Sequence, residues 1–175
     1  MKNKRKFNTI QLIGTIIIMS VILWLPTAVF AQENPLKLSM TGHLAIFYND
    51  DSGKEVAKLM PLPEIVEKGD IIQYDIVGEN TSAKSLFNIN AGGKIPKGTS
   101  YIDKSARCDL ENEVLFSIDN GKHYAVPPIK QIVKMADGTK KEEEVSIGSY
   151  TDIRFKIKKL EPGQKFIGSY AVTVY

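Results

Sequence analysis

The chain has 175 residues, which suffices for one domain of ordinary size but not for two with separate cores. Its 43% hydrophobic and 25% charged residues are average for a globular protein and exclude a wholly disordered chain. The formal net charge of +3 depends on four basic residues within the first six positions, since residues 32–175 carry 19 Lys and Arg against 20 Asp and Glu. This near-neutral body gives no electrostatic support for a nucleic-acid partner.

Residues 1–31 have the pattern of a secretory signal peptide, whose apolar part is expected to be helical. A basic start is followed by 22 uncharged residues from Ile10 to Ala31, and Pro26 ends the apolar block shortly before the small-residue pair Val29 and Ala31. An uncleaved anchor is the alternative, because about 20 apolar residues suffice to span a bilayer. The positions of Pro26 and the small residues favour cleavage after Ala31. The protein is therefore expected to be secreted or periplasmic, and to contact a membrane only through this segment if it stays uncleaved.

The rest of the chain is expected to be a short tether, residues 32–36, followed by one domain, residues 37–175. The first expected strand covers residues 43–48, and the acidic loop at 49–55 is interpreted as its hairpin turn. Clustered carboxylates suit Ca²⁺, but the loop lacks the spacing of an EF-hand. We therefore expect no metal and no cofactor.

Three segments show the alternation of apolar and polar residues that a half-buried strand requires. They are residues 71–77, residues 151–158 and the C-terminal segment from Phe166 to Val174. In the second, Arg154 and Lys156 are expected to face solvent. The residues predicted to form the core are Tyr74, Ile153, Phe155, Ile157 and Tyr170.

Turn signals recur at spacings of about ten residues, which is typical of an antiparallel sandwich or barrel. The sequence Asp119-Asn120-Gly121 predicts a type I′ turn between strands at 115–118 and 123–126. Asp137-Gly138 predicts a second such hairpin, between residues 132–135 and the run ending at Val145. No long window after residue 31 has the 3.6-residue period of a helix, so the expected fold class is all-β.

Gly92 and Gly93 are expected to interrupt a strand shortly before Ile95. Glycines weaken a strand interior and allow close approach of another backbone. This pair is therefore our candidate for an interaction edge.

No motif with catalytic spacing is present, so the protein is not expected to be an enzyme. The only cysteine, Cys108, cannot form an intrachain disulfide and has no catalytic Cys–His motif. A serine with His123 and Asp119 could be imagined as a triad, but no nucleophile motif supports it. Trp24 is the sole tryptophan and lies in the leader, which leaves tyrosines for stacking on a sugar; the candidates are Tyr101, Tyr124 and Tyr150.

From about residue 63 to 175 the chain resembles the repeat domain of bacterial and archaeal surface and secreted proteins known as domain of unknown function eleven. The segments that carry the resemblance are 68–74 (KGDIIQY), 79–81 (ENT), 95–101 (IPKGTSY), 116–122 (FSIDNGK), 150–155 (YTDIRF) and 160–164 (LEPGQ). Phe155 stands where the family has Trp, and Gly92-Gly93 is a second departure. The resemblance implies an immunoglobulin-like antiparallel β-sandwich without established catalytic residues.

Together these features predict a non-catalytic structural or interaction module of the cell envelope, which binds envelope proteins through its surface or strand edges. A carbohydrate-binding module is one alternative, to be recognised by tyrosines clustered on an exposed face. A secreted hydrolase is the other, to be recognised by a pocket with convergent ionisable groups.

Overall fold

The computed structural model describes residues 34–175, which form an all-β fold without an α-helix among them. Their one helical turn is a short 3-10 segment, η1 (Ile147–Ser149). Consequently, no helix in this part of the chain is long and apolar enough to cross a membrane. The expected signal peptide and its cleavage site lie outside the described residues.

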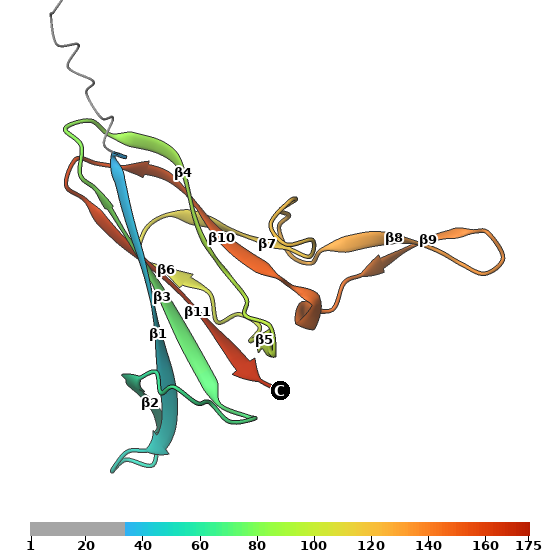
Figure 1. The fold of residues 1–175 in the computed structure, drawn as a ribbon, viewed down its shortest axis with the longest axis horizontal. Helices are drawn as coiled ribbons and strands as arrows, with labels where there is room; N and C mark the ends of the chain where they lie inside the picture. Colours follow the sequence, from blue (N-terminus) through green and yellow to red (C-terminus); the bar gives the residue numbers. More distant parts are fainter. Residues whose placement is uncertain (1–33) are drawn as a thin grey trace, which may run out of the picture. The chain divides into compact units, whose positions relative to one another are not determined.

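Two antiparallel sheets pack face to face over one core, as in a β-sandwich, and a separate hairpin extends away from them (Figure 1). The first sheet has the order β2-β1-β3-β11-β5, with β6 also paired to β11. Its strands are β1 (Leu36–Asn49), β2 (Glu55–Pro61), β3 (Ile71–Asn80), β5 (Thr99–Tyr101), β6 (Arg107–Cys108) and β11 (Lys165–Val174). The second sheet has the order β4-β10-β7, with β4 (Leu86–Lys94), β7 (Asn112–Ser117) and β10 (Asp152–Leu160). The hairpin consists of β8 (Lys130–Lys134) and β9 (Lys140–Glu144).

The alternation in β10 places its apolar side chains in the core, as predicted. Ile153, Phe155 and Ile157 are at most 1% exposed, because every second side chain of a strand points to the same face. Lys156 faces solvent as expected. Arg154 also lies on the outer face, but it is half-buried because its guanidinium stacks 3.5 Å from the centre of the Tyr124 ring.

The tyrosines of the two central strands of the first sheet stack on each other. Tyr74 in β3 and Tyr170 in β11 are register partners, and their ring centres are 5.4 Å apart. Tyr170 is fully buried and donates a hydrogen bond to the carbonyl oxygen of Lys94 at 2.7 Å. Tyr74 is only partly buried and packs against the core from its margin.

The domain begins earlier than residue 37. Leu36, expected to be the end of a tether, is the first residue of β1 and pairs with Asn80. The carbonyl oxygen of Pro35 accepts a hydrogen bond from the backbone N–H of Thr81 at 2.9 Å. These backbone bonds fix the start of β1, and no hydrophobic pattern in residues 34–36 signalled them.

Of the two predicted hairpins only the second forms, and its loop is longer than two residues. Asn120 and Gly121 have the expected positive φ angles of 61° and 81°, but only Phe116 and Ala125 pair across this loop, and the strand expected at residues 123–126 is absent. In the second hairpin only Gly138 has a positive φ, and Met135 bonds Thr139 across residues 136–138. This is the three-residue loop with glycine in the left-handed conformation.

Candidate functional site

The first sheet is wider than the second, and part of its inner face is therefore uncovered. β4 packs opposite β3, and no strand of the second sheet lies beyond β4 to cover β1 and β2. Leu38 and Met40 of β1 pair with inward-facing residues of β3, yet they are 46% and 44% exposed. Further along β1, Ile46 and Tyr48 share this face and are also exposed. We call these four side chains and the free edge of β4 the open side.

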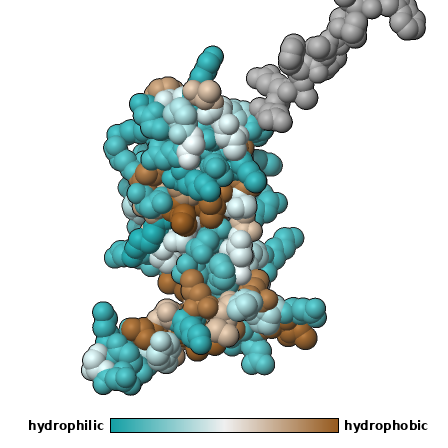
Figure 2. Space-filling view, turned by 90° about the vertical axis from the view of Figure 1, so that its left-hand side faces the viewer, coloured by the Kyte–Doolittle hydropathy of each residue, from teal (hydrophilic) through white to brown (hydrophobic). Residues whose placement is uncertain are grey.

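The opposite face of the same part of β1 is polar. Ser39 and Thr41 alternate with Leu38 and Met40 and point away from the core. The inner face of this part of β1 is therefore apolar, as a buried surface would be, but no strand of the second sheet covers it. Figure 2 views the molecule from the side on which β1 and β2 lie in Figure 1, and hydrophobic groups reach the surface there among hydrophilic ones.

Gly92 and Gly93 lie in the edge strand β4, which runs through both of them without interruption. The predicted break is wrong, whereas their predicted position at an edge agrees with the sheet order. A Cβ atom at Gly92 would lie 2.4 Å from the carbonyl oxygen of Ile153, and one at Gly93 would lie 3.1 Å from Met40 Cε. The glycines thus allow close packing, and Met40 joins the free edge of β4 to the exposed face of β1.

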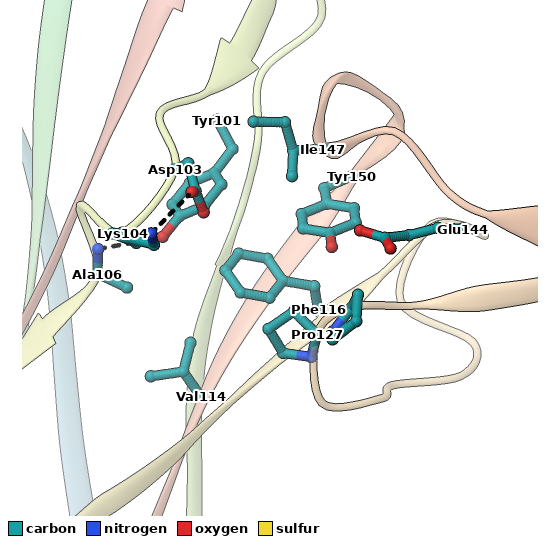
Figure 3. Close-up of a pocket in the computed structure, with 11 residues that line it drawn as sticks. Tyr101, Asp103, Lys104, Ala106, Val114, Phe116, Pro127, Glu144, Ile147 and Tyr150 are labelled. Atoms are coloured by element: carbon teal, nitrogen blue, oxygen red, sulfur yellow. Dashed lines mark hydrogen bonds and ion pairs between the residues drawn. The ribbon is translucent and has the colours of Figure 1, made fainter.

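An aromatic pocket of about 540 Å³ lies beside η1 (Figure 3). The Phe116 and Tyr150 rings stack with their centres 4.6 Å apart, and Tyr101 packs 4.7 Å from Phe116. Both tyrosines are only 5% exposed, and burial raises the pKa of Tyr150. They form part of the core and offer no exposed sugar-stacking platform.

The ionisable groups around this pocket do not converge. Asp103 and Lys104 form an exposed ion pair 4.0 Å long on one side, and Figure 3 shows Glu144 on the other side of the aromatic rings. A general acid and base would have to approach one reacting atom within hydrogen-bond distance. The pocket is therefore an apolar cavity whose surrounding ionisable groups do not face a common point.

Asp119 organises its turn and does not activate a nucleophile. Its Oδ1 accepts hydrogen bonds from Ser117 Oγ at 2.8 Å and from the His123 backbone N–H at 2.9 Å, and its Oδ2 lies 2.6 Å from His123 Nδ1. These bonds hold the pKa of Asp119 well below its usual range, with the His123 backbone N–H as the largest cause. Ser117 is buried and bonded to the carboxylate, whereas a catalytic triad needs the hydroxyl on the imidazole.

The acidic loop between β1 and β2 is a hydrogen-bonded turn, as interpreted. Asp50 Oδ1 accepts from Ser52 N, Ser52 Oγ and Lys54 N at 2.6–3.0 Å. Within residues 34–175 no group of three or more His, Cys, Asp or Glu residues is placed to hold a metal ion. Cys108 is half-buried, and burial raises the pKa of its thiol, which opposes the thiolate form that a nucleophile needs.

Comparison with known proteins found no matching family model, no matching curated protein and no matching solved structure. The resemblance to domain of unknown function eleven accordingly stays a hypothesis. The open side was not predicted from the sequence. β2 lacks strict alternation, and β4 is rich in Asn and Gly, so the bounds of neither strand were predicted and the unequal width of the sheets could not be foreseen.

Proposed function

We propose that the protein is an exported, non-catalytic interaction module that binds an extended segment of an envelope protein along its open side. The segment adds to the second sheet as a strand next to β4. In this proposal the domain is an immunoglobulin-like β-sandwich, and residues 1–31 direct its export and are then removed.

The observation that carries the proposal is the combination of a free strand edge with an uncovered apolar face beside it. An edge strand presents backbone N–H and C=O groups to an added strand, and alternate side chains of that strand enter pockets on one face. Leu38 and Met40 are each nearly half exposed. Covering the exposed part of each side chain stabilises a complex by on the order of 1 kcal/mol per residue.

A single segment fits this surface better than a second copy of the domain. In a symmetric antiparallel pair joined through β4, the two-fold axis stands perpendicular to the sheet, and both first sheets lie on the same side of it. β1 and β2 of each copy extend past β4 on that side. β1 and β2 of one copy would then clash with β1 and β2 of the other copy. A single added strand causes no such clash.

Photo-crosslinking in the cells that make the protein tests the proposal. A photoreactive phenylalanine analogue replaces Leu38, which faces the open side, or Ser39, its neighbour on the opposite face. We expect an adduct from position 38 and none from position 39. Mass spectrometry should map the adduct to a partner segment with apolar residues at alternate positions.

Two charge variants form a matched pair for the same experiment. Met40→Lys places a charge on the open side and should abolish the adduct from position 38. Thr41→Lys places the same charge on the opposite face of β1 and should preserve it. Equal adducts from positions 38 and 39, no adduct at all, or an adduct that persists in Met40→Lys would contradict the proposal.

A further inference from the structure

A second pocket, of about 310 Å³, opens on the outer face of the second sheet, on the side of β4 that faces away from the core. Its lining is polar and comes from three segments: β4, β10 and the loop after β7. The lining side chains that matter here are Asn90, Lys94, Tyr124, Asp152 and Arg154, with Gly92 between the first two. Its volume is near the lower end of the range of about 300–1,000 Å³ that small-molecule sites occupy.

Asp152 in this pocket is a buried carboxylate without a partner. The residue is only 6% exposed, and its Oδ2 has no hydrogen-bond partner among the described residues. The turn at Gly121 covers it, because a Cβ atom there would lie 3.3 Å from Asp152 Oδ1. Burying a charge without a partner is strongly destabilising. The other carboxylate oxygen, Oδ1, also accepts no hydrogen bond within residues 34–175 but is not fully buried, so a ligand in the pocket reaches the carboxylate through Oδ1.

The two cations of the pocket do not satisfy this carboxylate. Arg154 follows Asp152 on the same face of β10, but its guanidinium lies over the Tyr124 ring at 3.5 Å from the ring centre. Lys94 is the register partner of Asp152 on β4. Within residues 34–175, neither Arg154 nor Lys94 forms an ion pair with Asp152.

The charges of the lining disfavour a ligand that carries only positive or only negative charge. An anion would find Lys94 and Arg154 but would leave Asp152 unpaired and repel it. A cation would pair with Asp152 but would face two positive charges. A hydroxyl group donates a hydrogen bond to a carboxylate and accepts one from a guanidinium or an ammonium group at the same time.

We infer that this pocket binds a neutral polyhydroxyl ligand of the size of one sugar unit. Asp152 accepts from the ligand's hydroxyl groups, while Arg154, Lys94 and Asn90 donate to their oxygen atoms. Gly92 has no side chain and leaves the entrance beside β4 open. This site lies on the opposite face of β4 from the open side, so the inference does not depend on the proposed function.

NMR titration of the full chain tests the inference through the backbone amides of Gly92, Gly93 and Gly121. The probes are methyl α-glucopyranoside, methyl α-mannopyranoside and N-acetylglucosamine, each compared with acetate, methylammonium and glycine. We expect saturable shifts of these three amides with at least one sugar and with none of the charged probes. Saturable shifts with a charged probe alone, or no saturable shift with any of the sugars, would overturn the inference.

Asp152→Asn separates binding from a structural role. The variant should weaken sugar binding at least tenfold, because it replaces a charged acceptor by a neutral one. Without sugar, its melting temperature should not fall, because the substitution removes a buried charge that has no partner. Lys158→Gln, on the same face of β10 but outside the pocket, should bind like the wild type. Undiminished binding by Asp152→Asn would overturn the inference.

Discussion

Among single residues, Phe155 shows how directly the alternation of apolar and polar residues along a strand determines which side chains are buried. The side chain is fully buried and packs against Gly168 of the facing sheet, where a Cβ atom would lie 3.0 Å from the Phe155 ring. The missing side chain of Gly168 makes room for the ring. The sequence signalled the burial of Phe155 but not its partner, because the contact joins different strands across the sandwich.

Phe155→Ala should destabilise the fold by about 3–5 kcal/mol, since it leaves a cavity in a close-packed core. Lys156→Ala should cost at most about 1 kcal/mol, because Lys156 contributes only an exposed ion pair with Glu113 at 3.4 Å. Chemical denaturation of both variants measures the difference. Similar losses in the two variants would mean that the assignment of faces in β10 is incorrect.

The lowered pKa of Asp119 predicts that the stability of the folded domain depends on pH. Because its pKa is lowered in the folded protein, first by the His123 backbone N–H, the ionised form stabilises the turn at any pH above the carboxyl's ordinary value of 3.8. This contribution is lost as the pH falls below that value. Asp119→Asn should therefore melt at a lower temperature than the wild type at pH 6, and the difference should shrink between pH 4 and pH 2. A difference that stays constant over this range would contradict the prediction.

At the scale of elements, strands were predictable where one face is apolar and the other charged, as in β10. The bounds and continuity of a strand were not predictable where this alternation is absent and contacts with distant residues hold the strand in place. β4 contains Asn88 with a φ of 53° and two adjacent glycines, which lower its intrinsic strand propensity. It is held in place by pairing with β10, and this long-range contact left no local pattern in the sequence.

The β8–β9 hairpin is expected to be separable from the rest of the fold. Its strands pair only with each other, while Ile129 and Val145 at its base are buried in the core. Replacing residues 131–143 with a short Gly-Ser linker should change the free energy of unfolding by less than about 1 kcal/mol.

The matched control for this replacement is Ile129→Ala, which should cost about 2–5 kcal/mol. Thermal or chemical unfolding of both variants provides the measurement. If loss of the hairpin destabilised the fold as much as Ile129→Ala, the hairpin would have to be an integral part of the domain.

At the scale of the whole molecule, export is predicted to remove the leader. The mature chain should begin at Gln32, and because Trp24 is the only tryptophan, its emission should show tyrosine alone. Intact-mass and fluorescence measurements on protein from the exported fraction test this. Tryptophan emission and the mass of the full chain would instead indicate a retained anchor.

The unequal width of the two sheets is the central feature of the molecule. Hydrogen exchange of the β4 amides tests most directly whether a partner strand adds beside this uncovered part of the first sheet. The exchange is measured in the free protein and in the adduct crosslinked at position 38. An added strand should protect amides within Leu86–Lys94 and leave β7, the opposite edge of the same sheet, unchanged. Unchanged exchange in β4, or new protection at β7 alone, would contradict strand addition at the open side.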